Sequence, residues 1–278
     1  MNKIVKVDNL KIVYKNDEVY CIKKGNNDVI EKLRYLKSKD FNNFIDTKYQ
    51  DGYEIRDYIK EVEITSEDKL NELVYIISLL HTKTTFYKNI SLNEIKTFYE
   101  EETEEIYDIK KDYEALCDKY DANLFMPFSM NLLVRNISLF LISLDNSKYF
   151  LDEWYRIMKD KQRKRVVFNH NNLKLSNFIV GDYSYLINWN NSIIDSPVVD
   201  IYSLFKNNYK DIDIIDAFDI YTAKYQLLEE EKYLLYHKLC KIEALEVSND
   251  EILNTRKVYD KVIFLKKVFE LLKNNVKR

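Results

Sequence analysis

The sequence predicts an α+β fold with two lobes, a small antiparallel β-rich lobe with one helix (residues 1–60) and a larger helical lobe (residues 61–278). Residues 3–24 contain three short runs rich in β-branched and aromatic residues, which are typical of strands. An Asp-Gly pair then separates two further runs of this kind. Beyond about residue 60, apolar residues recur at helical spacing instead.

The elements predicted for the first lobe follow one another closely. Strands of a small antiparallel sheet are expected at residues 4–7, 10–14 and 19–23. A helix is predicted from three apolar residues at helical spacing, Val29, Leu33 and Leu36. Residues 44–49 and 53–58 flank Asp51-Gly52, and this pair between two strand-like runs is a strong hairpin signal.

Capping signals mark helix starts in the second lobe. Three segments have the form in which a hydroxyl and an acid three residues later satisfy the free amides of a first turn: Thr65-x-x-Asp68, Ser91-x-x-Glu94 and Ser248-x-x-Glu251. Helices are therefore expected near residues 67–83, 92–121, 129–160, 197–209 and 250–275. Two brief strands, residues 178–180 and 185–187, lie among them.

Composition excludes several classes of protein. The chain of 278 residues is 46% hydrophobic and can bury a sizeable core. Its 43 basic and 46 acidic residues leave a formal charge of −3, which is not the basic footprint of a nucleic-acid-binding protein. The three cysteines lack C-x-x-C spacing, and no two of the three histidines have metal-ligand spacing. We expect a reducing, cytoplasmic environment and interpret His81 and His237 as packing residues.

No membrane span is expected. Residues 1–7 alternate polar and apolar residues as a strand does, and no signal-peptide core follows them. The most apolar run, residues 130–144, is interrupted by Asn131, Arg135 and Asn136 and is short for a bilayer. We interpret it as a buried core helix.

Residues 167–180 carry the most specific motif. They contain His170, Asn172 and Asn177, followed by the apolar run 178–180. This spacing resembles the catalytic loop of the aminoglycoside phosphotransferase and choline kinase-like family, H-G-D-x-x-x-x-N followed by a strand. Eleven residues after Asn177, Ile187-Asn188-Trp189-Asn190 resembles the family's metal motif, I-D-W-D or I-D-W-E. In both motifs an amide, Asn172 or Asn188, stands where the family has an Asp.

Further resemblances extend from about residue 19 to residue 205. Cys21-Ile22-Lys23 resembles the strand that ends in the family's phosphate-contacting lysine, and Glu31 follows where the family has an acid that pairs with that lysine. Residues 195–202 resemble G-D-P-x-x-D-L-A, in which the last Asp, here Asp200, supports the catalytic loop. Residues 79–82 resemble the end of a family helix. The likeness is strongest to bacterial spore-coat kinase-like proteins.

The resemblance implies a protein kinase-like fold and a set of roles. Lys23 and Glu31 would serve the nucleotide, Asn177 and Asn188 would stand at the metal, Asn172 at the position of the base, and His170 would stabilise the loop. An amide cannot act as a base, and general base catalysis contributes roughly a factor of 10² to 10⁴. Magnesium is usually held by one or two carboxylates together with phosphates. The implied cofactors are ATP and Mg²⁺, although the two amides leave open that neither binds.

Three functional hypotheses follow. The first is a catalytically degenerate kinase-like protein, a bacterial pseudokinase that binds a nucleotide or a protein partner in the cytoplasm or in association with the spore. The second is an active ATP-dependent phosphotransferase acting on a hydroxyl acceptor such as choline, a sugar or an aminoglycoside. The third is a structural coat or scaffold protein. The sequence does not specify the acceptor, the partner or the oligomeric state.

Overall fold

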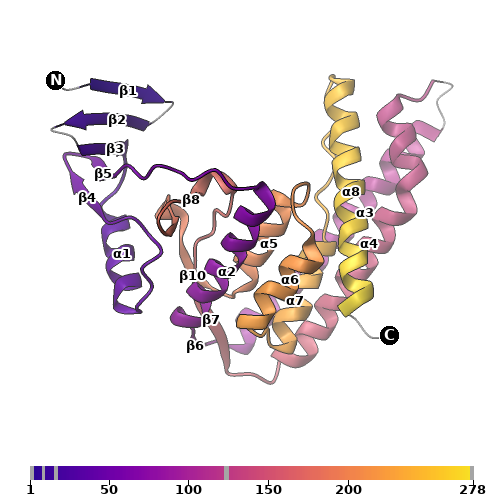
Figure 1. Cartoon of the computed structure of the whole chain (residues 1–278). Helices are drawn as coiled ribbons and strands as arrows, with labels where there is room; N and C mark the ends of the chain where they lie inside the picture. The colour runs from indigo at the N-terminus through magenta and orange to yellow at the C-terminus, as the bar shows by residue number, and fades with distance from the viewer. Residues whose placement is uncertain (1–2, 8–9, 16–17, 122–124, 276–278) are drawn as a thin grey trace. The chain divides into compact units, whose positions relative to one another are not determined.

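The computed structural model describes residues 3–7, 10–15, 18–121 and 125–275 (Figure 1). Its helices and small antiparallel sheets confirm the predicted α+β class. Packing divides the chain into two compact units. The first comprises Met1–Phe86, Arg165–Ile212 and Asp216–Gln226, and the second comprises Tyr87–Lys164, Asp213–Ile215 and Leu227–Arg278. This division into packed units does not test the predicted lobe boundary near residue 60, which stays a prediction.

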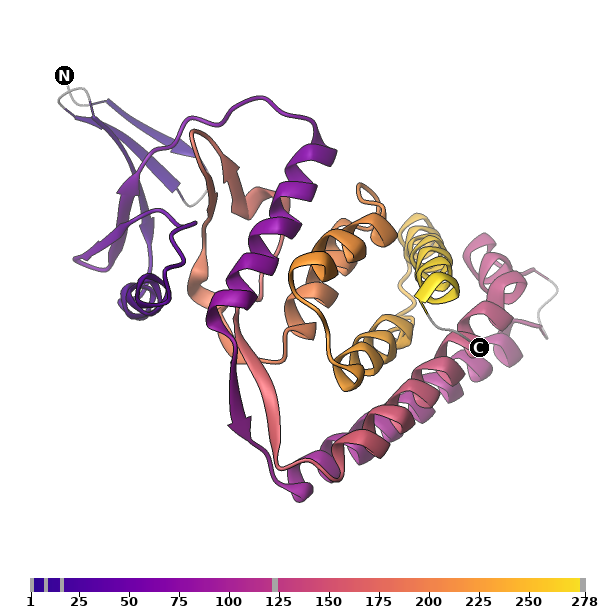
Figure 2. The same cartoon turned by 60° about the horizontal axis from the view of Figure 1, so that its bottom comes forward.

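A five-stranded antiparallel sheet begins the first unit (Figure 2). Its strands run in the order β1-β2-β3-β5-β4. Their bounds are β1 Lys3–Val7, β2 Leu10–Lys15, β3 Glu18–Lys24, β4 Thr47–Gln50 and β5 Tyr53–Asp57. The three predicted N-terminal strands are thus confirmed as a meander in which β2 pairs with both β1 and β3.

The Asp-Gly hairpin is also confirmed. β4 and β5 pair antiparallel, with Gln50 opposite Tyr53 on either side of the turn. The φ angles of Asp51 and Gly52 are 51° and 84°. Two central residues with positive φ are the requirement of a type I′ turn, and Asp-Gly meets it at low steric cost.

The rest of the first unit combines helices with short strands. Its elements are α1 (Asp28–Ser38), α2 (Ser66–Thr84), β7 (Arg163–Asn169), η1 (Leu175–Asn177), β8 (Phe178–Val180), β9 (Ser184–Leu186), η2 (Trp189–Asn191), β10 (Ile193–Asp195), α5 (Val198–Asn208) and α6 (Ile214–Lys224). α1 buries the three apolar residues that predicted it, Val29, Leu33 and Leu36. α2 begins as expected, because the Thr65 side chain accepts a hydrogen bond from the amide of Asp68.

Long helices build the second unit. Its elements are β6 (Phe86–Asn89), α3 (Leu92–Asp121), α4 (Phe128–Met158), α7 (Glu229–Cys240) and α8 (Glu251–Asn275). α4 is long and apolar enough to cross a membrane by length and composition, and 33% of its most apolar window is buried. Met130, Leu133, Phe140 and Leu144 of this helix lie in the core cluster of the unit. One side of this helix therefore contributes to the core, and its interpretation as a buried core helix stays a prediction.

The capping boxes of the second unit have different outcomes. Ser91 and Glu94 form the reciprocal hydrogen bonds that the motif predicts. Ser248 and Glu251 do not form the predicted reciprocal bonds, although α8 begins at Glu251, where the predicted helix starts. The Glu251 carboxylate instead accepts hydrogen bonds from the amide and hydroxyl of Ser129, at the start of α4, at 2.6 and 2.9 Å. Glu251 therefore makes a tertiary contact with another helix, where the local motif predicted a bond within its own first turn.

Candidate functional site

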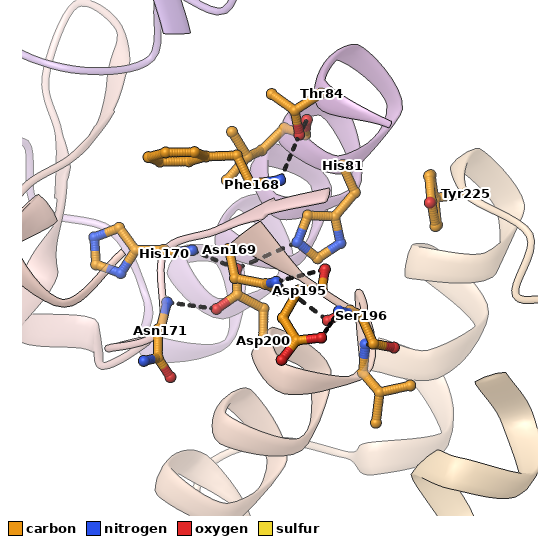
Figure 3. Close-up of polar contacts among 12 residues, drawn as sticks. His81, Thr84, Phe168, Asn169, His170, Asn171, Asp195, Ser196, Asp200 and Tyr225 are labelled. Carbon is orange, nitrogen blue, oxygen red and sulfur yellow. Dashed lines mark hydrogen bonds and ion pairs between the residues drawn. The ribbon is translucent and has the colours of Figure 1, made fainter. Parts of the chain in front are cut away.

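The loop after β7 is held by one buried carboxylate of the first unit. Asp200 lies in the first turn of α5 and is fully buried. Its two oxygens accept hydrogen bonds from the backbone amides of His170 and Asn171, each at 2.7 Å (Figure 3). Hydrogen bonds to a charged acceptor are the stronger kind, so this pair fixes the start of the loop. Asp200 therefore has the supporting position that the resemblance implied.

His81 in turn holds Asp200. His81 Nε2 lies 3.2 Å from Asp200 Oδ2, and His81 Nδ1 lies 2.6 Å from the hydroxyl of Tyr221. All three side chains are buried. The interpretation of His81 as a hydrogen-bonded packing residue is confirmed, and the structure adds its connection from α2 to the loop (Figure 3).

Two further side chains brace β7, and the sequence analysis did not identify them. The Asn169 side-chain amide donates to the backbone carbonyls of Asp195 and Ser196, at 3.0 and 3.1 Å. The amide of Phe168 donates to the Thr84 hydroxyl at 3.1 Å (Figure 3). These bonds join strands and a helix end that are distant in sequence, so no local motif reports them.

His170 has a structural environment. Its ring is buried, and Nε2 donates to the backbone carbonyl of Ile187 at 2.9 Å. A carbonyl can only accept, so Nε2 carries the proton of the neutral ring. Burial lowers the pKa of His170, because the charged ring would lose its hydration. The ring also meets Trp189 edge to face, with centroids 4.7 Å apart. His170 thus ties the loop to the residue that precedes Asn188.

A chain of hydrogen bonds connects Lys23 with three asparagines. Lys23 Nζ donates to Asn188 Oδ1 at 3.1 Å. Asn188 Nδ2 donates to Asn177 Oδ1 at 2.6 Å, and Asn177 Nδ2 donates to the backbone carbonyl of Asn172 at 2.8 Å. We call this series the amide relay. It brings together four of the predicted site residues, and the three amides in it carry no formal charge.

The backbone of Asn188 suits either an amide or an acid. Its φ and ψ angles are 67° and 55°, in the left-handed region. Asn and Asp enter this region more readily than other non-glycine residues. An Asp at this position would meet the same backbone requirement. Asn in place of Asp therefore changes the charge of the side chain and not the local conformation.

Glu31 does not join the relay. It is an exposed residue of α1, and within the described part of the chain it forms no ion pair with Lys23. The next residue, Lys32, donates to the backbone carbonyls of Trp189 and Asn190 at 3.2 and 2.7 Å. Desolvation lowers the pKa of Lys32. α1 is therefore tied to the segment after Asn188 by a cation that the sequence analysis missed.

A second acid, Glu54, lies opposite Lys23 in the sheet. The register of β3 and β5 pairs these two residues, and directly opposed side chains share a face of the sheet. Glu54 is 8% exposed, and Asn190 Nδ2 lies 3.5 Å from its Oε1. A Cβ atom at Gly25 would overlap the Glu54 carboxyl group, so glycine provides the room for it. Strand register, which the sequence does not show, brings this acid to the site.

The donor set does not fit magnesium. Magnesium favours carboxylate oxygens, whereas Asn177 and Asn188 offer neutral amide oxygens that already accept hydrogen bonds. Asp195 Oδ1 accepts from the amide of Ser196 at 2.7 Å, and both oxygens of Asp200 hold the loop. Among the residues that the structure describes, no group of three or more His, Cys, Asp or Glu side chains is arranged to hold a metal ion.

Solved structures with a similar fold are phosphotransferases. An aminoglycoside phosphotransferase from Alicyclobacillus acidocaldarius is similar at a TM-score of 0.68 and 10% identity, over 98% of this chain and 90% of the other. This chain has the aminoglycoside phosphotransferase fold. The AMP-bound complex of a spectinomycin phosphotransferase is similar at a TM-score of 0.50 and 10% identity, over 97% and 87%. A choline kinase from Streptococcus pneumoniae is similar at a TM-score of 0.47 and 16% identity, over 99% of this chain and 94% of the other.

Sequence comparison is less informative than structure for this phosphotransferase-like chain. No protein-family model matches the sequence, and no curated protein matches it significantly. The fold similarity confirms the kinase-like, two-lobed class that the spaced motifs predicted. At 10% identity it shows the fold alone.

Proposed function

We propose that this chain is a catalytically degenerate member of the phosphotransferase fold that binds a nucleotide without transferring its phosphate. The observation that supports this proposal is the amide relay. The positions that would hold a base and a metal carry neutral amides. The amides of Asn177 and Asn188 bond to each other, Asn188 bonds to Lys23, and Asn177 bonds to the backbone carbonyl of Asn172. The fold that surrounds them is intact, since Asp200 and His170 still order the loop.

Nucleotide binding would use the relay in a changed form. A phosphate group is a stronger partner for a lysine than a neutral amide, because both groups are charged. Lys23 would exchange Asn188 Oδ1 for a phosphate oxygen, and the freed amide could turn to present its NH₂ group to the same phosphate. Binding of this kind needs no divalent cation. The spectinomycin phosphotransferase of similar fold has AMP bound in its solved structure, which is a precedent for nucleotide binding by a protein of this fold.

Transfer of phosphate would be slow for two reasons. Without a carboxylate at residue 172 the acceptor hydroxyl has no base there, a loss worth roughly 10²- to 10⁴-fold. Without a metal, the charge that develops on the transferred phosphoryl group is neutralised by Lys23 alone among the relay residues. We therefore propose that the protein acts by binding, with a nucleotide or a protein partner, in the cytoplasm of a bacterium. A link to the spore coat rests on the sequence resemblance only.

An active phosphotransferase is the second candidate. The similarity in fold to an aminoglycoside phosphotransferase and the retained support of the loop by Asp200 favour it. Under this alternative a hydroxyl acceptor such as choline, a sugar or an aminoglycoside would be phosphorylated from ATP. Glu54, the buried acid opposite Lys23, would then be the first residue to test for a contribution to phosphate or metal binding.

A thermal-shift titration with ATP, with and without Mg²⁺, tests the proposal. A ligand that binds only the folded state adds about 2.7 kcal/mol of stability at a hundredfold excess over its Kd. We expect stabilisation by ATP that is independent of Mg²⁺ and no phosphorylated product. Stabilisation that requires Mg²⁺, with turnover, would favour the enzyme instead. No stabilisation in either condition would contradict nucleotide binding and favour a scaffold.

Asn188→Asp is the variant that isolates the missing charge. It keeps the left-handed backbone and adds a carboxylate beside Lys23. We expect Mg²⁺-dependent ATP stabilisation to appear in Asn188→Asp and to be absent from Asn191→Asp, which adds the same charge at an exposed position nearby. Equal behaviour of the two variants would show that residue 188 is not at a cation site.

A further inference from the structure

β4 has a free edge. It is the outer strand of the five-stranded sheet, and among the residues that the structure describes it pairs with β5 only. In the two-residue hairpin, Gln50 and Tyr53 close the turn as a hydrogen-bonded pair, and bonded and non-bonded pairs alternate from there. The backbone amides and carbonyls of Thr47 and Tyr49 therefore point away from β5. Within the described residues they have no other backbone partner.

A hollow of about 610 Å³ adjoins this edge and is lined in part by residues of α1. Its lining includes buried Phe44 and apolar residues of α1. Its charged residues are mostly cations. Lys37 and Asp46 form an exposed ion pair at 3.8 Å, whereas Arg34 and Lys48 form no ion pair among the described residues. The hollow therefore has an excess of positive charge on its rim.

A second hollow of about 820 Å³ adjoins the same strand. It extends over the face of the sheet on which Ile22, Ile55 and Lys48 are successive cross-strand neighbours. Val13 and Tyr20 add to the apolar part of its lining, and these two residues and the isoleucines are half-buried. The charged part of the lining is mixed, with Glu18, Asp46 and Asp57 beside Lys48 and Arg56. No residue of α1 lines this hollow.

We infer that β4 is a docking edge for an extended peptide in which acidic and apolar residues alternate. An added strand would bond to the outward backbone groups of Thr47 and Tyr49, as in recognition by β-augmentation. Successive side chains of a strand point to opposite sides. One set would meet Arg34 beside α1, and the other set would cover Ile22 and Ile55 on the face that also carries Lys48. An exposed strand edge can pair with strands of other chains and cause aggregation. A specific peptide partner would cover the edge of β4.

The occupant follows from charge and polarity. In the first hollow a basic side chain would be repelled by Arg34, and a wholly polar peptide would leave the isoleucine face in water. This inference is independent of nucleotide binding, because none of its residues belongs to the amide relay.

Fluorescence polarisation of a labelled peptide of alternating glutamate and valine tests the inference, in the absence of nucleotide. We expect saturable binding to the full chain and none of a matched lysine-valine peptide. Arg34→Glu should weaken binding by about tenfold. The same charge reversal at Lys111, exposed on α3 in the second unit, should change it less than twofold.

Tyr49→Pro provides the second test, because it removes an outward amide and none of the bonds to β5. We expect it to abolish peptide binding while circular dichroism and the melting temperature stay close to those of the parent chain. Binding that survives Tyr49→Pro in the folded protein would exclude strand addition. Failure of the glutamate-valine peptide to bind at all, or equal binding of the lysine-valine peptide, would overturn the inference.

Discussion

Replacement of Asp200 by Asn should destabilise the catalytic-loop segment strongly. The carboxylate is fully buried and accepts backbone hydrogen bonds from His170 and Asn171, and His81 adds a third contact. An amide keeps one acceptor and turns an NH₂ group toward the other backbone amide. A hydrogen bond to a charged group contributes about 1.5–3 kcal/mol, and a buried donor left without a partner costs about 1–3 kcal/mol. We expect Asp200→Asn to lose about 3–5 kcal/mol, a large part of the roughly 5–15 kcal/mol that stabilises a typical domain.

Two measurements check this expectation. Urea unfolding gives the change in free energy, and amide hydrogen exchange reports the backbone of His170 and Asn171 directly. Exchange at these two amides should accelerate in Asp200→Asn, while the meander of β1 to β3 should be unaffected. Asp182→Asn, at an exposed turn position, is the control and should change stability by less than about 0.5 kcal/mol. A loss below about 1 kcal/mol in Asp200→Asn, with unchanged exchange, would refute the proposed support of the loop.

Two further predictions concern buried carboxylates. Gly25→Ala should lower stability by about 1–3 kcal/mol in thermal unfolding, because the new methyl group would overlap the Glu54 carboxyl; the loss should shrink in a background of Glu54→Ala. In the second unit, burial raises the pKa of Glu102, but hydrogen bonds from His237 and Lys241 and the neighbouring positive charges together outweigh burial and lower the pKa to about 2. A pKa below the unfolded value adds stability that is present above about pH 4.5 and lost as the pH falls toward about 2. Glu102→Gln should flatten this pH dependence of the unfolding free energy, whereas Glu101→Gln, at an exposed position, should not. An equal pH dependence in the parent chain and in both variants would contradict the role of Glu102.

Much of the fold could be predicted from local patterns. Strand-like runs identified the meander, Asp51-Gly52 identified the hairpin, and apolar spacing identified α1. These features depend on residues that are close in sequence, so their physical causes are visible in it. α6 and α7 were not predicted. The residue before α7 is Leu228, which has no side-chain oxygen with which to cap a helix, so the start of that helix carries no hydroxyl or amide signal.

The candidate site was predicted in part. The spacing of His170, Asn177 and Asn188 predicted a common loop region. In the structure Asn177 bonds to Asn188, and His170 bonds to the backbone carbonyl of Ile187, the residue before Asn188. Their proposed roles stay predictions. Lys32 and Glu54 were missed, because the rotation of α1 and the register of β3 with β5 bring them to the site.

The sequence by itself determined that two positions expected to carry acids carry amides, since this is a matter of residue identity at a given spacing. It also determined the elements that short-range propensity controls. Only the tertiary structure decided what those amides bond to, which carboxylate lies opposite Lys23, and which strand edge stays open. Hydrogen bonds, register and edges are relations between segments distant along the chain, and no local free-energy preference encodes them.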